Sequence, residues 1–187
     1  GEHLPDRRRG ERLVGAADVA PTLANPLYND ALNFIGTANA MVTALGRSGD
    51  SSFKVVPGVE IRSSGDMTLA ADWNLYNWHF ANDTPGILTL RAAGNLVFQQ
   101  SLSDGFVALP DPNNFDPDAT SLAFTLPNQR RESWSYRLVG GADPTSSNAL
   151  ATRLLGDTAS NSGNVRVLPS GVIGLIEAVE TLKILLG

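Results

Sequence analysis

The chain has 187 residues, which is enough for one domain with a sizeable core. Hydrophobic residues make up 42% and charged residues 18%, so it is too apolar for a disordered chain and too polar for a membrane protein. Acidic residues outnumber basic ones by 19 to 14, and we therefore expect no nucleic-acid partner. Cysteine is absent, which excludes disulfides, thiolate metal sites and thiol nucleophiles.

Residues 1–52 are expected to form an irregular lead-in that contains one helix, at about 30–45. Apolar residues fall three and four positions apart over that range. Asn29 or Asp30 is available as the N-cap, and Gly46 lies just past the end. The sequence therefore predicts a short N-terminal helix.

Beyond this helix the sequence changes to short runs in which every second residue is apolar, a pattern typical of β-strands. Three segments, at 64–69, 93–98 and 162–167, share the motif small-Gly-[Asp/Asn]-apolar-x-apolar. The predicted turn residues of this motif are Gly65, Asp66, Gly94, Asn95, Gly163 and Asn164. The first two copies lie 29 residues apart, which fits one coil of a β-solenoid whose apolar residues point inward and stack.

The repeated units favour an all-β fold of the β-helix type, because one strand-turn-strand unit cannot bury its own apolar face. We expect β-helical coils over residues 53–187, with loop inserts at 72–84 and 110–118. Residues 172–186 are a candidate capping segment. An antiparallel β-sandwich built from the same strands is the alternative, and it differs because a β-helix stacks the three motif copies in register along a parallel sheet.

Three blocks of sequence resemble, in order, segments of filamentous haemagglutinin-like large exoproteins. The first is VPGVEIRSSGDMTLAADW at residues 56–73. The second is PGILTLRAAGNL at 85–96, followed by SLSDGF at 101–106, and the third is SWSYRLVGGAD at 133–143. The resemblance covers about half of the chain.

This resemblance implies a right-handed parallel β-helix from a secreted or cell-surface exoprotein of a Gram-negative bacterium. It also implies two-partner secretion, in which an outer-membrane partner exports the parent protein, and a function in adhesion, aggregation or toxin display. The expected ligands are host-cell or bacterial surface proteins or glycans. Open ends of a solenoid would also permit end-to-end self-association.

Carboxylates are the only plentiful catalytic groups, and polysaccharide-cleaving β-helix enzymes use clustered aspartates as acid and base. Asp66, Asp72 and Asp104 are the candidates for this alternative function. However, Asn95 and Asn164 take the place of Asp66 in the repeated motif, which indicates a role in turn geometry. We therefore expect a protein that is not an enzyme, with no catalytic residue.

Aromatic side chains are concentrated in one short segment, where flat apolar faces are suited to stacking on sugar rings or partner proteins. The candidate binding residues are Trp73, Tyr76, Trp78 and Phe80. The competing interpretation is that Trp73 and Trp78 cap the core. A small carbohydrate-binding module remains a second alternative function.

Metal and cofactor chemistry has little support in the sequence. His3 and His79 are the only histidines, they lie far apart in the chain, and His79 is interpreted as structural. The oxygen-rich loop at 110–118 matches no calcium-binding spacing. We expect neither a metal nor a cofactor.

Overall fold

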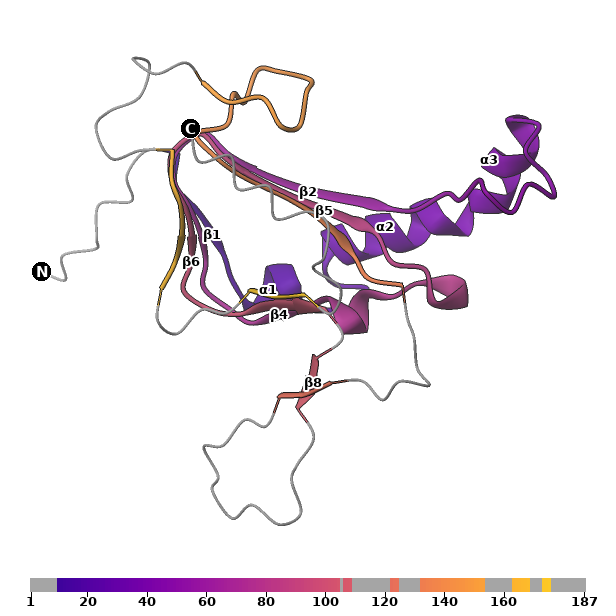
Figure 1. Ribbon diagram of the computed structural model, residues 1–187, viewed down its shortest axis with the longest axis horizontal. Coiled ribbons are helices and arrows are strands. Elements are labelled where there is room, and N and C mark those ends of the chain that lie inside the picture. The colour runs from indigo at the N-terminus through magenta and orange to yellow at the C-terminus, as the bar shows by residue number, and fades with distance from the viewer. Residues whose placement is uncertain are drawn as a thin grey trace, which may run out of the picture.

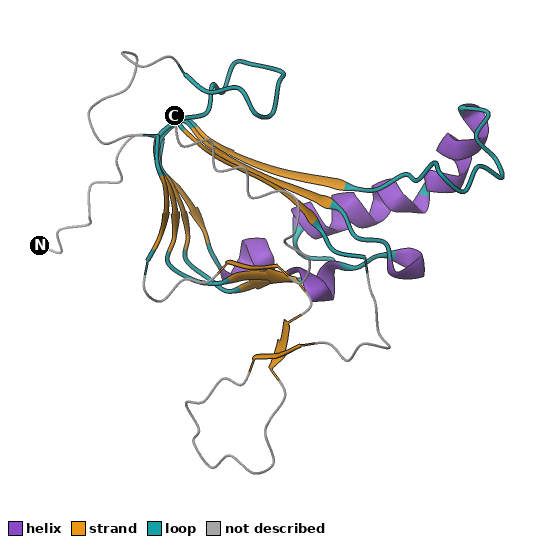
Figure 2. Ribbon diagram, in the orientation of Figure 1, coloured by secondary structure: helices purple, strands orange, loops and turns teal. Residues whose placement is uncertain are grey.

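The structure, a computed structural model, describes residues 10–104, 106–108, 122–124, 132–153, 163–168 and 173–175. Most strands belong to three short parallel sheets (Figures 1 and 2). Sheet A has the order β1 (Arg12–Val14), β3 (Met67–Leu69), β6 (Leu96–Phe98) and β11 (Val165–Val167). Sheet B has the order β10 (Ser135–Gly140), β5 (Ile87–Ala92) and β2 (Gly58–Ser63). Sheet C has the order β12 (Ile173–Leu175), β7 (Leu102–Asp104) and β4 (Trp73–Asn74).

The chain visits the three sheets in the same order three times. We call β2-β3-β4, β5-β6-β7 and β10-β11-β12 the first, second and third repeat units. Met67 lies opposite Leu96, and Leu96 lies opposite Val165, all in parallel pairings. The parallel, in-register pairing expected for the three motif copies is therefore confirmed.

The fold class predicted from these repeats, an all-β right-handed parallel β-helix, is wrong. The chain is mixed α/β: its short parallel sheets share one core with helices from the N-terminal region. The helices are α1 (Ala16–Val19), α2 (Pro26–Gly36) and α3 (Ala38–Ala44). Ala31 and Ile35 of α2 are buried in the same cluster as the strand residues, so this helix completes the core. The repeat motif predicts only which strands pair with each other. It does not predict which other element packs against the first repeat unit.

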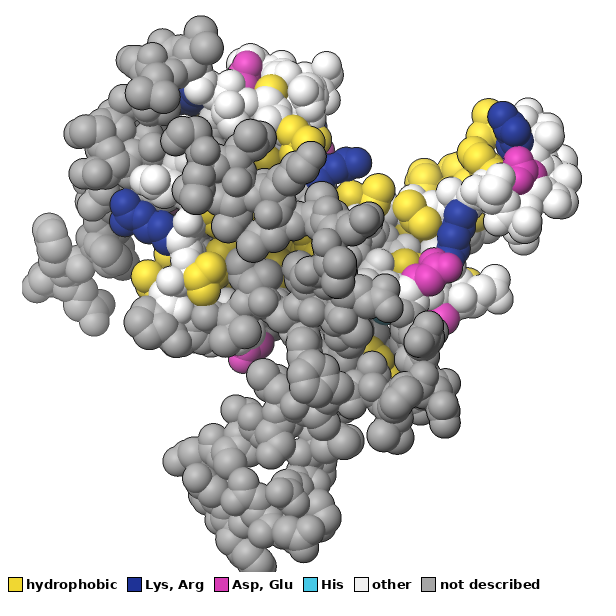
Figure 3. Space-filling view, viewed as in Figure 1, with side chains coloured by type: hydrophobic (Ala, Val, Ile, Leu, Met, Phe, Trp, Pro, Cys, Tyr) yellow, Lys and Arg dark blue, Asp and Glu magenta, His cyan; other side chains and the backbone are white. Residues whose placement is uncertain are grey.

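The predicted helix at 30–45 is observed as two helices, α2 and α3, and the first of them begins earlier, at Pro26. Asn25 is the N-cap of α2: its side-chain oxygen accepts a hydrogen bond from the amide of Leu27 at 3.0 Å, and Pro26 takes the first helical position. The side-chain amide of Asn25 also donates hydrogen bonds to the carbonyls of Asp18 and Ala20, both at 2.8 Å, and so connects α1 with α2. The short α3 buries no residue and projects away from the sheets, where apolar side chains remain on the surface (Figures 1 and 3).

Alternation along the strands places the core between the sheets. In β2, Val59, Ile61 and Ser63 are buried while the residues between them are exposed. Met67 and Leu69 of β3 are fully buried, and so are Leu96 and Phe98 at the equivalent positions of β6. In β11, an edge strand of sheet A, Val165 and Val167 are by contrast 46% and 49% exposed.

The structure describes the whole of one predicted insert and part of the candidate capping segment. The insert at 72–84 contains β4 and two 3₁₀ helices, η1 (Leu75–Trp78) and η2 (Ala81–Asp83), and much of it is buried. The described part of the candidate capping segment at 172–186 is β12, which pairs with β7. The insert at 110–118 lies outside the described residues, between the strands of an antiparallel hairpin, β8 (Phe106–Ala108) and β9 (Leu122–Phe124).

In the part of the chain that the structure describes, no helix is long and apolar enough to cross a membrane.

We expect Gly94→Ala to destabilise the fold, because the second repeat unit passes close to the first at this glycine. A Cβ atom there would overlap the carboxylate of Asp66 and lie 3.0 Å from its backbone nitrogen. Such overpacking costs about 1–3 kcal/mol, and urea unfolding measures it. Gly58→Ala is the matched control: no atom lies within 4 Å of its new methyl group, and its stability should stay within about 0.5 kcal/mol of the wild type. Equal losses in the two variants would contradict the close approach.

Candidate functional site

A buried histidine between two aspartates is the most distinctive polar cluster among the described residues. His79 follows η1, Asp83 ends η2, and Asp104 ends β7. The side chains of His79 and Asp104 are only 4% and 3% exposed, whereas that of Asp83 is 42% exposed. The cluster therefore joins the aromatic segment to the last strand of the second repeat unit.

Both ring nitrogens of His79 face oxygen atoms. Nε2 lies 3.3 Å from Oδ1 of Asp104, and Nδ1 lies 3.1 Å from Oδ1 of Asp83 and 3.2 Å from its carbonyl oxygen. Burial lowers the pKa of His79, but the hydrogen bond and negative charge of Asp104, with the charge of Asp83, outweigh it. The net effect is a pKa above the ordinary value of 6.5.

Asp104 also holds the start of the third repeat unit. Its Oδ2 accepts a hydrogen bond from the backbone amide of Trp134 at 2.6 Å. Tyr136, two residues later, lies near this carboxylate: burial raises the pKa of its phenol, and the charge of Asp104 raises it further. The Tyr136 hydroxyl is buried with no hydrogen-bond partner among the described residues.

The predicted aromatic binding residues lie mainly inside the molecule. Trp73 and Trp78 are fully buried and Phe80 is 6% exposed. Trp78 packs edge-on against Tyr28 of α2 at a centroid distance of 5.1 Å, and its indole donates to the carbonyl of Val19 at 3.0 Å. Their burial favours the interpretation that these side chains close the core.

The fourth predicted binding residue, Tyr76, is partly buried, and its ring lies 6.3 Å from that of His79.

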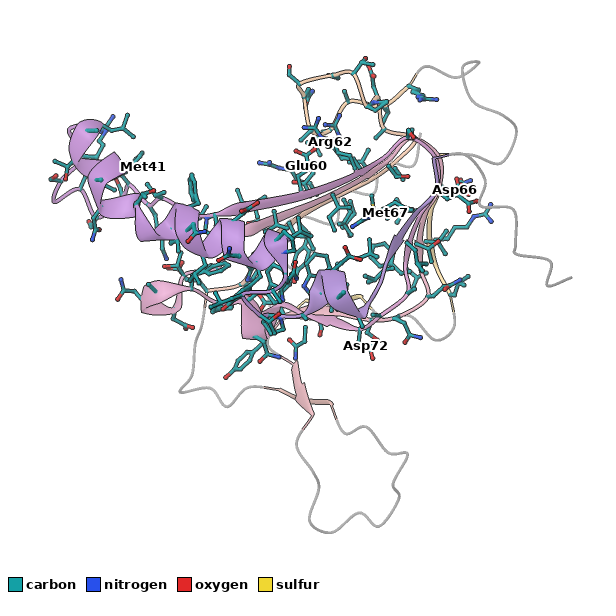
Figure 4. The ribbon with its side chains drawn as sticks, turned by 180° about the vertical axis from the view of Figure 1, so that it is seen from behind. Met41, Glu60, Arg62, Asp66, Met67 and Asp72 are labelled. Atoms are coloured by element: carbon teal, nitrogen blue, oxygen red, sulfur yellow. The ribbon has the colours of Figure 1, made fainter. Side chains whose placement is uncertain are left out.

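The three aspartates considered as catalytic candidates each contact the next repeat unit. Oδ1 of Asp66 accepts from the amide of Asn95, and Oδ1 of Asp72 accepts from the amide of Ser101, both at 2.8 Å. The contact between Asp104 and Trp134 is the third of this kind. Asp66 and Asp72 lie well apart in Figure 4, so these two carboxylates do not form the adjacent pair that acid-base cleavage requires.

The predicted turn residues form a ladder through the repeat units. Oδ1 of Asn95 accepts from the amide of Asn164 at 3.1 Å, which continues the contact made by Asp66 one unit earlier. The glycines of the motif permit this close spacing: a Cβ at Gly65 would lie 3.0 Å from the carbonyl group of Gly10. Gly163 has a φ of 90°, in the left-handed region that favours glycine.

Sequence reasoning missed a degenerate copy of the motif at Gly10. The pairing of Arg12 with Met67 places Gly10 opposite Gly65, and the amide of Gly65 donates to the Gly10 carbonyl at 3.0 Å. Glu11 and Arg12 stand at the Asx and first apolar positions, so this segment does not match the motif. The available signal was the glycine followed by an acidic residue and a terminal apolar residue.

Arg91 is a second buried charge that the sequence did not reveal. It is 2% exposed, contacts Glu60 at 3.2 Å, and donates to the carbonyls of Asp143, Ser146 and Asn148. Glu60 also pairs with Arg62, as Figure 4 shows, and these hydrogen bonds lower the pKa of Glu60 against the effect of burial. Arg91 thereby fixes the loop after β10 over sheet B.

The described cluster has limited chemical scope. With both ring nitrogens of His79 engaged, the imidazole has no free position from which to activate a nucleophile. Within the described ranges, no group of three or more His, Cys, Asp or Glu side chains is arranged to hold a metal ion. His3 and the 110–118 loop, both weighed for metal binding, lie outside those ranges. The contacts of His79 and the two aspartates connect structural elements inside the protein.

We expect Asp104→Ala to destabilise the protein by about 2–3 kcal/mol, because it leaves the buried amide of Trp134 without its acceptor. Asp72→Ala removes the same type of contact, to the amide of Ser101, at an exposed position where water can replace it. Its loss should stay below about 1 kcal/mol. Chemical denaturation of both variants compares them, and a larger loss for Asp72→Ala would contradict the role assigned to burial.

Comparisons with protein-family models, curated proteins and solved structures found no match for this chain. The resemblance to large exoproteins therefore rests only on the three sequence blocks at 56–73, 85–106 and 133–143.

Proposed function

We propose that this chain is a non-catalytic structural and adhesive segment of a secreted bacterial surface exoprotein. The observation that carries the proposal is the use of the candidate catalytic carboxylates. Asp66, Asp72 and Asp104 each accept a backbone amide from the following repeat unit, at 2.6–2.8 Å. A carboxylate that accepts a backbone amide of the next unit has a structural role in stabilising the stack, which does not require a substrate.

Exchange of Asp for Asn along the same ladder supports this function. Asn95 makes to Asn164 the contact that Asp66 makes to Asn95. An amide oxygen accepts a hydrogen bond as a carboxylate oxygen does, but it cannot act as a base at neutral pH. The shared role of the two residue types is therefore geometric.

An adhesive function needs a surface loop that the stacked repeat units present to a ligand. Arg91 fixes the 143–148 loop through three backbone carbonyls, which holds an exposed loop in one conformation. Ordering a binding loop before contact lowers the entropy cost of association. Secretion, the outer-membrane partner and the choice of a surface protein or glycan as ligand are carried by the resemblance at residues 55–143.

The competing function is carbohydrate cleavage, and one pair of assays separates the two. We expect beads coated with the folded chain to retain host or bacterial cells better than beads coated with the heat-denatured chain. We also expect no release of reducing ends from a panel of polysaccharides.

Asp72→Asn provides the control, since it keeps an acceptor for Ser101 and removes the carboxylate. Adhesion should be unchanged in this variant. Hydrolysis by the wild type that disappears in a folded Asp72→Asn or Asp104→Asn variant would overturn the proposal, as would a lack of any difference in cell retention between folded and denatured chain.

A further inference from the structure

The turn at residues 80–84 is held in a strained conformation at the surface. Asn82 and Asp83 both have a φ of 58°, in the left-handed region that is unfavourable for residues other than glycine. The turn is closed by two backbone hydrogen bonds between Phe80 and Thr84, at 3.0 and 3.3 Å. Asn and Asp adopt this region more readily than other non-glycine residues, and contacts to the rest of the fold help to hold the turn in this conformation.

His79 provides such contacts. Through Nδ1 it contacts Asp83 within the turn, and through Nε2 it contacts Asp104 on β7. One imidazole therefore connects the strained turn with a strand of the second repeat unit. Both contacts become charge-assisted hydrogen bonds only when the ring carries two protons, because a neutral imidazole has one N–H donor.

The turn covers part of the aromatic core. The Phe80 ring lies 5.6 Å from that of Tyr28 on α2 and 6.2 Å from that of Trp134, next to β10. Phe80 is 6% exposed, whereas residues 81–83 at the tip of the turn are exposed. Loosening of the turn would therefore loosen the contact between the helices and the third repeat unit.

We propose that His79 is a pH-sensitive clamp that holds the 80–84 turn against β7 when it is protonated and releases it when it is neutral. This device is additional to the structural function proposed above. It does not depend on adhesion, because it concerns only how the fold is closed.

The groups around His79 determine the direction of the switch. Asp83 faces it from η2, Asp104 from β7, and the Tyr76 ring from η1. Tyr136 of β10 lies near Asp104, and its pKa is raised by burial and by that charge, so it does not titrate in the physiological range. The two carboxylates favour the imidazolium, and its deprotonation leaves them without a cation between them.

The pKa of His79 determines whether a rise in pH stabilises or destabilises the closed turn. The pKa of His79 in the closed form is raised above its ordinary value of 6.5, despite burial, by Asp104 and Asp83. A group of this kind stabilises the closed form fully below its pKa in the open form, and the contribution is lost as the pH rises through the closed-form pKa. Each unit of difference between the two values changes the equilibrium of local opening by about tenfold.

The test is an NMR titration of the full chain combined with amide hydrogen exchange at residues 80–84, corrected for intrinsic exchange rates. His3 and His79 are the only histidines, so His79→Gln assigns the second ring signal by its disappearance. We expect His79 to titrate above 6.5 and the protection of the turn, relative to β5, to fall as the pH passes the midpoint.

Two variants separate the clamp from a merely structural side chain. In His79→Gln, the protection of the turn should no longer vary with pH. In Asp83→Asn, whose carboxylate is 42% exposed, the fold should persist while the His79 midpoint moves down. If His79→Gln fails to fold, the wild type and Asp83→Asn still decide. A midpoint at or below 6.5, or protection that stays constant through the titration, would overturn the proposal.

Discussion

The backbone amides between the short strands need acceptors inside a closely spaced stack, and backbone carbonyls of neighbouring repeat units and side-chain oxygens of the preceding unit supply them. Sheet A uses strands of three residues, so much of each unit lies at a strand end or turn, where the amides need acceptors outside the regular sheet pairing. Asp66, Asn95, Asp72 and Asp104 supply them. Because each contact joins two units in one register, it also aligns the apolar side chains that form the core.

The sequence was informative where a pattern repeats. The Gly-Asx motif predicted which strands would pair, and Met67, Leu96 and Val165 do lie in register. It did not predict the fold class, because the helices that pack against the strands belong to no repeat. Asn25 and Pro26 start α2 several residues before the predicted helix, and Ile35 is buried among strand residues. Which surface a helix covers depends on tertiary packing, and the spacing of apolar residues does not specify it.

The candidate site shows a similar division. The turn role of Asp66 could be predicted, since Asn occupies the same motif position in the other copies. The contact between His79 and Asp104 could not be predicted, because the two residues are 25 positions apart and belong to no shared motif. The cluster of aromatic residues was predicted to be a candidate binding surface, but aromatic side chains suit a core equally well. The position of α2 shows that Trp78 is covered.

Disulfide trapping can test the parallel register of the repeat units, because the chain has no cysteine of its own. Thr68 and Val97 are in-register partners in sheet A, and both are partly exposed. Neighbouring strands lie about 4.8 Å apart, within the reach of a disulfide, whereas an offset of two residues separates the Cα atoms by about 8 Å. We expect the double variant Thr68→Cys/Val97→Cys to crosslink under mild oxidation and Thr68→Cys/Gln99→Cys not to do so. Crosslinking of the offset pair alone would contradict the register and the account built on it.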